Sequence, residues 1–342
     1  MKYAVVGFGT AGYHAVKKIR ELDKEGCIDV YSNTGRAPYN PMLTTYYAFG
    51  KLEYEGMFPF GDLEQIQKEV DFNLRREQVI KVHGSEHLVE TENGSEQYDR
   101  ILIATGARAF APPVKGLEPE DAFLMRTVED ALRFKDRLKK NDIKHAVVIG
   151  ASMAGIKVVE VLHKYGIETW LLDLASYIFP LAAYKEVAKE IEKRVEAQGV
   201  HLMFGVTIDH MEQENGEKTA VLTDGSRIPA DIVGLCIGTR AITETVQGEV
   251  EIGRGIVVDD HMRTSVPGIY AAGDCCEGNN LESGQNQIIG LWANANHQGE
   301  TAGINMAGGD MAYKGNILHN ITHFMNMDFI GFGDNRMQGE VL

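Results

Sequence analysis

The sequence has little cysteine, and its cysteines are badly spaced for redox or metal chemistry. Four occur in 342 residues, at Cys27, Cys236, Cys275 and Cys276. No CxxC pair and no two-pair zinc spacing is present, which argues against a thioredoxin-type dithiol and a zinc ribbon. We interpret Cys236, Cys275 and Cys276 as packing residues. Sparse, unpaired cysteine is typical of a reducing compartment, so we expect a cytoplasmic protein.

Basic charge and long apolar runs are also scarce. The 49 acidic and 34 basic residues give a net charge of -15, which argues against nucleic acid or an anionic membrane as the main partner. No apolar run approaches the roughly 20 residues of a membrane span, and the start "MKYAVVGFG" is typical of a buried strand rather than a signal peptide. The 11 histidines contain no HExxH pattern, and we expect no metal site.

What the sequence does contain is a glycine triplet directly after an apolar run. The stretch "VVGFGTAGYHAV" places Gly7, Gly9 and Gly12 between a strand ending near residue 6 and a helix with Gly26 as its stop. In that context the first glycine permits a tight turn, the second lets backbone approach a pyrophosphate, and the third lets helix and strand pack closely. The motif therefore predicts a dinucleotide site at a helix N-terminus.

The pattern recurs in "HAVVIGASMAGIKVVEVLHKYG", with Gly150, Ser152 and Gly155 at the triplet positions. Asp173 ends the next strand, where a carboxylate binds a ribose 2'-hydroxyl, and no Arg or Lys follows in "LLDLASYIFP" to receive a 2'-phosphate. This favours NAD(H) over NADP(H). The first unit ends its second strand at Ser32 instead of an acid, so we expect a weaker grip on that ribose. Together with 342 residues and 44% hydrophobic content, two motifs indicate two domains.

Three further stretches resemble the FAD-dependent pyridine nucleotide-disulfide oxidoreductases, a family that includes rubredoxin and ferredoxin reductases and NADH oxidases. They are "YDRILIATGARAFAPP", "TSVPGIYAAGDCCE" and "LWANANHQGETAGINMAGG". The resemblance implies an α/β fold of the glutathione-reductase type with two Rossmann-like domains, the first motif holding FAD and the second NAD(H). It implies an FAD domain at 1–112 and 246–315, an NAD domain at 113–245, and a remnant of the C-terminal interface domain at 316–342.

The resemblance also implies the cofactor-binding residues. They are Gly7, Gly9, Gly12, Ser32, Arg36, Val79, Thr105, Gly106, Gly273, Asp274, Trp292 and Ala293 for FAD, and Gly150, Ser152, Met153, Gly155, Asp173 and Gly238 for NAD(H). For Arg36 the resemblance implies a contact with the FAD phosphate, and an ordinary surface-loop arginine is nearly as good an explanation. The helix that begins near Trp292 would direct its N-terminus at the flavin pyrimidine and stabilise negative charge there.

The sequence departs from the family in the segment after the second strand. "NTGRAPYNPMLTTYYAFGK" contains no cysteine, so thiol chemistry is not expected there. Asn40 stands where relatives place a Lys near flavin N5, and Lys157 stands where they place its Glu partner. We hypothesise that Lys157 projects toward the flavin and replaces the missing cation, which would raise the flavin potential. The alternative is a solvated helix lysine.

The C-terminal stretch "YKGNILHNITHFMNMDFIGFGDNRMQGEVL" is too short for the interface domain of roughly one hundred residues that family members add. Its alternation predicts one or two strands, which rest on the FAD domain or are completed by another subunit. A shortened lid would expose the flavin, which favours a heteromeric complex.

The resulting functional prediction is an enzyme, an FAD-dependent NAD(P)H:acceptor oxidoreductase. It would transfer electrons between NAD(H) and an iron-sulfur or rubredoxin-type carrier protein. One alternative is an NADH oxidase that makes peroxide, and another is a flavin-binding redox-sensing subunit. An acidic ferredoxin would need a basic patch on this acidic chain, around Lys17, Lys18 and Arg20 or around Arg75 and Arg76.

Overall fold

The computed structural model describes residues 1–333, which form two compact units, each assembled from separate stretches of the chain. Unit 1 comprises Met1–Asn40, Phe58–Arg108 and Arg240–Leu318. Unit 2 comprises Pro41–Met57, Ala109–Thr239 and residues 319–333. The bounds predicted from the sequence differ mainly in assigning residues 41–57 to the FAD domain.

Unit 1 is built on a parallel five-stranded sheet in the order β18-β7-β1-β2-β3. The strands are β1 (Lys2–Val6), β2 (Cys27–Tyr31), β3 (Asn73–Arg75), β7 (Arg100–Ile103) and β18 (Ile269–Ala271). Most side chains of the central strands β1 and β7 and of β18, such as Val5 and Leu102, are buried, as expected of parallel strands covered on both faces. The carboxyl ends of β1, β7 and β18 therefore meet at one edge of the sheet.

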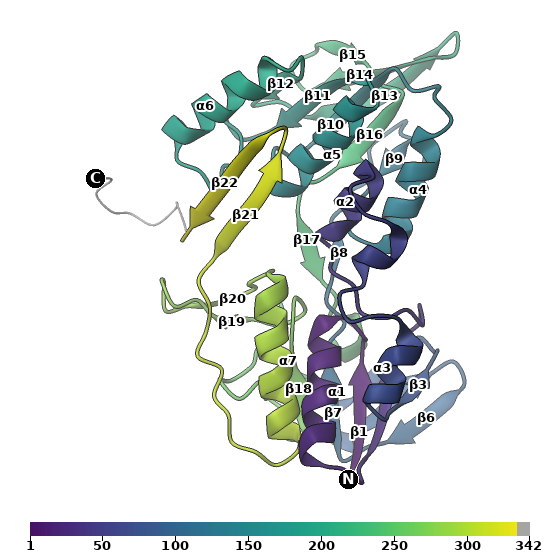
Figure 1. Cartoon of the computed structure of the whole chain (residues 1–342), viewed down its shortest axis with the longest axis vertical. Coiled ribbons are helices and arrows are strands. Elements are labelled where there is room, and N and C mark those ends of the chain that lie inside the picture. Colours follow the sequence, from purple (N-terminus) through teal and green to yellow (C-terminus); the bar gives the residue numbers. More distant parts are fainter. Residues whose placement is uncertain (334–342) are drawn as a thin grey trace. The chain divides into compact units, whose positions relative to one another are not determined.

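Two parallel helices cover this sheet, α1 (Thr10–Leu22) and α7 (Trp292–Met306), and they run side by side (Figure 1). Glycines make their close approach possible. A Cβ added to Gly299 would lie 2.2 Å from the carbonyl oxygen of Ala11, and one added to Gly303 would lie 2.5 Å from that of Ala15. Because both contacts advance by one helical turn, the N-termini of α1 and α7 point toward the same edge of the sheet.

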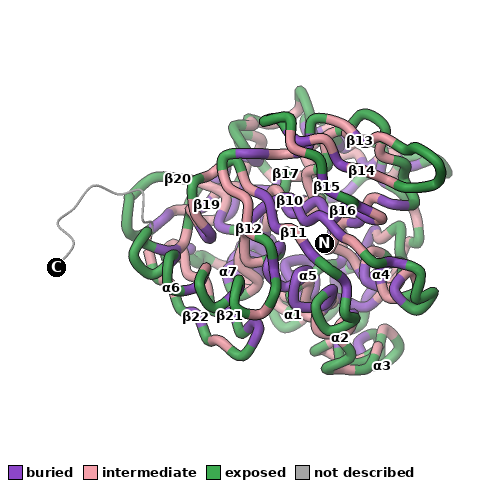
Figure 2. Tube along the Cα trace, turned by 90° about the horizontal axis from the view of Figure 1, so that it is seen from above, coloured by how far each residue is buried: buried purple, intermediate pink, exposed green. Residues whose placement is uncertain are grey.

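Unit 2 repeats this architecture with a parallel sheet in the order β12-β11-β10-β16-β9. The strands are β9 (Ala122–Phe123), β10 (His145–Ile149), β11 (Glu168–Asp173), β12 (His201–Phe204) and β16 (Ile232–Leu235). The helices are α2 (Leu43–Phe49), α4 (Val128–Leu138), α5 (Met153–Lys164) and α6 (Lys185–Glu196). Figure 2 shows the central strands β10 and β16 as buried.

Smaller elements complete both units. The three-stranded sheets are β4 (Val79–His83), β5 (Leu88–Thr91) and β6 (Gly94–Gln97), and β13 (Ile208–Glu214), β14 (Glu217–Leu222) and β15 (Arg227–Pro229). The two-stranded pairs are β8 (Ala107–Ala109) with β17 (Thr239–Ala241), and β19 (Gly278–Asn279) with β20 (Asn286–Gln287). The short helices are α3 (Leu63–Glu69), η1 (Tyr54–Met57), η2 (Gly84–Glu86) and η3 (Glu244–Val246).

The predicted C-terminal strands form a hairpin, β21 (His319–Phe324) with β22 (Met327–Phe332). Its inward side chains, Phe324 and Phe329, belong to the core of unit 2 and lie 5.5 Å and 5.2 Å from the ring of Phe179. The expected strands are thus confirmed, but they pack in the unit that contains the second glycine motif rather than on the FAD domain. Among residues 1–333, no helix combines the length and apolar character that crossing a membrane requires.

The α1–α7 contact generates a stability prediction. Gly303→Ala should lower the free energy of unfolding by about 1–3 kcal/mol, because the new methyl group collides with backbone, even though alanine is the better helix former. Urea denaturation measures this. Gly290→Ala is the control, since a Cβ there meets nothing within 4 Å. Equal midpoints for the two variants would contradict the close packing.

Candidate functional site

The first glycine loop is a tightly packed turn between β1 and α1. Gly7 has a φ of +105°, and a Cβ there would lie 2.3 Å from the carbonyl oxygen of Ala104 at the end of β7. A Cβ on Gly12 would lie 2.2 Å from the carbonyl oxygen of Gly7. Gly9, the N-cap of α1, instead faces open space, and a Cβ added there would meet nothing within 4 Å. Crowding thus explains Gly7 and Gly12, whereas Gly9 leaves room in front of the helix.

The second loop has nearly the same geometry between β10 and α5. Gly150 has a φ of +104°, and a Cβ there would lie 2.3 Å from the carbonyl oxygen of Cys236. A Cβ on Gly155 would lie 1.9 Å from the carbonyl oxygen of Gly150. The two sheets therefore use the same backbone turn, which brings a helix N-terminus close to a ligand.

The two loops differ at the helix N-cap. No side chain caps α1, so its first N–H groups are open to an anion. In α5 the hydroxyl of Ser152 accepts a hydrogen bond from the N–H of Gly155 at 3.2 Å and donates to the carbonyl oxygen of Cys236 at 3.0 Å. One of the N–H groups that could face a phosphate is therefore already bonded, and Met153, the first residue of α5, follows directly.

The strand ends beside the loops also differ, as the sequence indicates. Asp173 accepts hydrogen bonds from the N–H groups of Ala151 at 2.7 Å and Ala175 at 2.8 Å. This fixes its carboxylate against the second loop, and a carboxylate has further lone pairs for a ribose. Ser32 lies at the corresponding place in unit 1, where its hydroxyl contacts that of Thr34 at 3.4 Å.

Two other predicted segments line the first loop. Thr105 follows Ala104, and its hydroxyl donates to the carbonyl oxygen of Ile242 at 2.6 Å. Gly106, with a φ of +70°, accepts a hydrogen bond from the N–H of Ile242 at 2.9 Å. Gly273 packs against α1, where an added Cβ would lie 3.1 Å from the methyl group of Ala11. The packing of Gly7 on Ala104 and of Gly273 on Ala11 brings the ends of β1, β7 and β18 together around the α1 N-terminus.

Gly273 has a packing role that the sequence does not indicate. Its N–H donates to Oε1 of Gln298 at 2.9 Å, so this N–H is already used and Gln298 fixes the turn. Asp274 follows it, and its predicted contact with FAD stays a prediction. The Nε2 of Gln298 is buried without a hydrogen-bond partner in the described chain.

The start of α7 contributes aromatic surface. Trp292 is the first residue of α7, followed by Ala293, and its ring stacks on Phe60 at 5.7 Å. Its indole Nε1 is buried and has no partner among the described residues. Buried indole N–H groups normally find an acceptor, so a bound group at this helix N-terminus would satisfy it.

The remaining predicted residues are spread around both units. Val79 begins β4 and is buried. Arg36 and Asn40 are half-buried in unit 1. Gly238, with a φ of +105°, follows β16 in unit 2 and accepts a hydrogen bond from the N–H of Phe110 at 2.9 Å. Their contacts with cofactors stay predictions.

Lys157 is buried on α5, with 3% of its surface exposed. Its amino group forms an ion pair with Glu160, donates to the carbonyl oxygen of His323 at 2.7 Å and lies 4.5 Å from the ring centre of Tyr46. Burial lowers the pKa of Lys157. The alternative of a solvated helix lysine is therefore wrong, because the hairpin β21–β22 and α2 cover this face of α5. Its predicted action on the flavin stays a prediction.

Glu160 is the residue that sequence reasoning missed. It accepts hydrogen bonds from Lys51 at 3.0 Å and from the N–H of Met325 at 3.1 Å as well as from Lys157. Burial opposes its charged form, but the hydrogen bonds from the lysines outweigh burial and lower the pKa of Glu160. Its spacing three residues after Lys157 is an ordinary helix pair and could have pointed to it.

The cysteines are free thiols. Cys236 is buried, and burial raises the pKa of its thiol to about 12. The thiols of Cys275 and Cys276 are also buried and lie within hydrogen-bonding range of the carbonyl oxygens of Ile103 and Gly273, at 3.3 Å and 3.4 Å. These environments suit packing residues.

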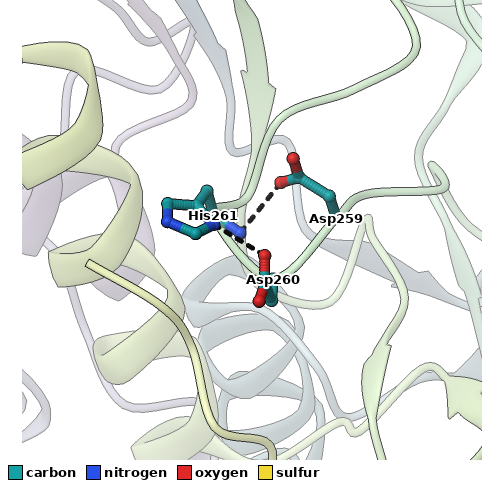
Figure 3. A group of neighbouring side chains, drawn as sticks. All are labelled: Asp259, Asp260 and His261. Carbon is teal, nitrogen blue, oxygen red and sulfur yellow. Dashed lines mark hydrogen bonds and ion pairs between the residues drawn. The ribbon is translucent and has the colours of Figure 1, made fainter. Parts of the chain in front are cut away.

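One group of possible metal ligands exists among the described residues, Asp259, Asp260 and His261 (Figure 3). Its members already bind one another and the backbone. Asp259 accepts the N–H groups of His261 and Arg263, at 2.8 Å and 2.9 Å. His261 pairs with Asp260 at 2.6 Å and Asp310 at 2.8 Å, and the Asp260 hydrogen bond raises the pKa of His261. The group therefore stabilises a turn.

Both loops fit the dinucleotides that the sequence predicts. In unit 1 the open space before Gly9, the uncapped α1 and the unpartnered Trp292 Nε1 suit an anionic cofactor with a polar ring system. In unit 2 the fixed Asp173 and the tight Gly150 turn suit a nucleotide with a free ribose 2'-hydroxyl.

Comparison with known proteins decides the family. The family described as pyridine nucleotide-disulphide oxidoreductase matches residues 1–299. The chain belongs to this family. The match confirms the predicted resemblance, the two-dinucleotide α/β fold, and FAD and NAD(H) as the cofactors of the family.

The relatives differ in what they do. The NADH-dependent phenylglyoxylate dehydrogenase subunit epsilon of Aromatoleum evansii is 28% identical, with 100% of this chain and 82% of that protein covered. An NADH oxidase of Methanocaldococcus jannaschii is 27% identical, and the match covers 90% of this chain and 70% of that protein. The solved NAD-dependent persulfide reductase from A. fulgidus has a TM-score of 0.89 at 26% identity, covering 95% of this chain and 62% of that one. This chain thus spans less than two thirds of that reductase.

Because the site in front of Gly9 is open, we expect a larger residue there to weaken FAD binding far more than it weakens the fold. Gly9→Val should lower the thermal stability of the apoprotein only slightly, because its φ of -80° suits any residue and nothing crowds the site, so that only the poorer N-cap residue has a cost. FAD affinity should fall at least tenfold, about 1.4 kcal/mol. Flavin per chain after gel filtration measures this. Gly7→Ala, strained and crowded, should instead lower stability. Full FAD content in Gly9→Val would contradict the assignment.

The buried ion pair predicts that Lys157→Met destabilises the protein. Without Lys157, the buried charge of Glu160 is balanced only by Lys51. The free energy of unfolding should fall by roughly 3 kcal/mol, the low end of the usual range, because Lys51 remains. Lys157→Met with Glu160→Met should recover part of the loss. If urea denatures Lys157→Met at the same midpoint as the wild type, the buried Lys157–Glu160 ion pair does not stabilise the protein. The flavin midpoint potential of the same variant tests the predicted action on flavin separately.

Proposed function

We propose that this chain transfers electrons between NAD(H) and an iron-sulfur or rubredoxin-type carrier protein, using FAD bound in unit 1. The observation that carries the proposal is the pair of equivalent glycine loops, at Gly7 and Gly150, each beside its own parallel sheet. Bound FAD would supply the conversion between a hydride from NADH and single electrons for an iron centre.

The residues of the chain have positioning roles in this reaction. The N-terminus of α1 would hold the FAD pyrophosphate, since its N–H groups and dipole favour an anion. The N-terminus of α7, beginning at Trp292, would stabilise negative charge on the flavin. Asp173 would bind the adenosine ribose of NAD(H) and disfavour a 2'-phosphate by charge repulsion.

The cysteines near these elements, Cys236, Cys275 and Cys276, are buried, which supports a protein acceptor rather than a disulfide. No cysteine occurs between Cys27 and Cys236. Cys27 is exposed, and the other three thiols are buried. A dithiol or a single reactive thiolate is needed to reduce a disulfide. Electrons therefore leave by another route.

A heteromeric assembly is part of the proposal. The Aromatoleum evansii relative, which covers the whole of this chain, is by name a subunit of an NADH-dependent dehydrogenase. In such an assembly the present chain would serve as the NAD(H)-reacting component, with the direction of electron flow set by the potential of its partner.

A second candidate is an NADH oxidase, which the name of the Methanocaldococcus jannaschii relative favours. Because residues 33–51 contain no cysteine, the expected product of dioxygen reduction is peroxide rather than water.

Stopped-flow kinetics distinguishes the two candidates. The FAD-loaded protein is reduced with NADH under anaerobic conditions, then mixed either with a carrier protein or with air-saturated buffer. Reoxidation by the carrier at least tenfold faster than by dioxygen is the expected result, with NADPH much slower than NADH as reductant. Faster reoxidation by dioxygen with peroxide release would favour the oxidase instead. Peroxide is measured at the end of each run.

A further inference from the structure

The two units carry different residues at one equivalent position, the end of the second strand beside the glycine loop. In unit 1 the N–H of Gly7 donates to the carbonyl oxygen of the residue before Ser32, at 2.9 Å. In unit 2 the N–H of Gly150 donates to the carbonyl oxygen of the residue before Asp173, at 2.7 Å. Ser32 and Asp173 are therefore equivalent, and the first loop lacks the negative charge that the second loop has at its ribose end.

The strand next to this position also differs in charge between the units. In unit 2 the register of β11 and β12 places Asp173 opposite Phe204. In unit 1 the register of β2 and β3 ends at Arg75, and the N–H of Ser32 continues the ladder by donating to the Arg75 carbonyl oxygen at 2.9 Å. The next residue along, Arg76, thus corresponds to Phe204. An acid and a phenylalanine in unit 2 are replaced by a serine and an arginine in unit 1.

The side chain of Arg76 lies against the turn that follows Ser32. A Cβ added to Gly35 would lie 3.0 Å from Nε of Arg76 and 3.1 Å from its Cδ. In the same turn the hydroxyl of Thr34 contacts that of Ser32 at 3.4 Å. We call Ser32, Thr34, Gly35 and Arg76 the β2 rim. These contacts bring two hydroxyl groups and a guanidinium group together beside the first glycine loop.

The guanidinium group of Arg76 is free to bind a ligand. It forms no hydrogen bond, ion pair or ring contact with residues 1–333, and the residue is exposed. The carboxylate of the next residue, Glu77, accepts a hydrogen bond from the hydroxyl of Thr91 at 2.7 Å. The preceding Arg75 is different, because it pairs with the buried carboxylate of Asp29 at 3.4 Å. The positive charge of the β2 rim is therefore not neutralised within the described chain.

The place of this charge gives it a meaning that an exposed arginine elsewhere would not have. In dinucleotide folds an acid at the end of the second strand binds a ribose 2'-hydroxyl, whereas an arginine near that position accommodates a 2'-phosphate. Asp173 and its surroundings have the first pattern, and Ser32 with Arg76 has the second. A guanidinium group also matches the geometry of phosphate, to which it donates two parallel hydrogen bonds.

We propose that the β2 rim is a subsite for a 2'-phosphate, so that unit 1 binds a 2'-phosphorylated adenine dinucleotide of the NADP(H) type in competition with FAD. The inference rests on the proposed function in taking the first loop as the FAD site. Arg76 would bind the phosphate, and the hydroxyl groups of Ser32 and Thr34 would donate further hydrogen bonds. The two units then select opposite riboses, since Asp173 in unit 2 repels the group that the β2 rim attracts.

Competition for FAD binding tests this subsite. The full chain is freed of flavin and titrated with FAD in the presence of ADP-ribose or of 2'-phospho-ADP-ribose, which differ only in the phosphate, at constant ionic strength. Flavin fluorescence reports FAD alone, so nucleotide bound at the second loop does not enter the measurement. The inhibition constant of 2'-phospho-ADP-ribose should be about tenfold lower than that of ADP-ribose. Equal constants, or tighter binding of ADP-ribose, would overturn the proposal.

Variants locate the effect at the β2 rim. In Arg76→Gln the ratio of the two inhibition constants should fall close to one, and in Ser32→Asp the preference should reverse. Because the ratio is taken within one variant, a general change in FAD affinity cancels, and thermal unfolding checks that each variant folds. The matched control is Arg254→Gln, at an exposed arginine of unit 1 whose N–H donates to Glu277. If this control lowers the ratio as much as Arg76→Gln, general charge binds the phosphate and the proposal fails.

Failure of the proposed function would give a different result. If the wild type binds FAD but neither nucleotide competes with it, the adenosine of FAD does not lie at the first loop. The FAD assignment and the subsite then fail together. If both nucleotides compete equally, the FAD assignment stands and only the subsite fails.

Discussion

The structure depends on the approach of a glycine loop to the end of a neighbouring strand, made twice in one chain. At Gly7 and at Gly150 a Cβ would lie 2.3 Å from the carbonyl oxygen of the adjacent strand end. Only glycine tolerates both this distance and a φ above +100°. The turn sets the direction of α1 and α5, and with it the two helix N-termini at which a dinucleotide can bind.

The two units share this turn but differ in how open the helix N-terminus beside it is. Gly9 leaves the α1 N-terminus free, whereas Ser152 caps α5 with its own hydroxyl. Ser32 leaves the strand end beside the first loop weakly bonded, whereas Asp173 is fixed by two N–H groups. Unit 1 therefore has more room in front of its helix, and we expect the more specific ribose contact in unit 2.

The two glycine loops could be predicted from the sequence, because they depend on local spacing, and the segments at Thr105 and Gly238 were indicated by the family resemblance. The surroundings of Lys157 could not. Its acceptor, the carbonyl of His323, is 166 residues away, and nothing in the local pattern of α5 indicates that a C-terminal hairpin covers it. Gln298 accepts a hydrogen bond from the N–H of Gly273. This role likewise follows only from the packing of α7. Long-range contacts of this kind depend on tertiary structure, which periodicity does not encode.

The central claim is that one chain binds FAD and NAD(H) at two loops and moves electrons between them. An anaerobic titration of the FAD-loaded protein with NADH, followed by the flavin spectrum, tests it most directly. We expect about one equivalent of NADH to bleach the flavin, because a hydride carries both electrons that the flavin accepts. A flavin that remains oxidised in excess NADH would contradict the claim.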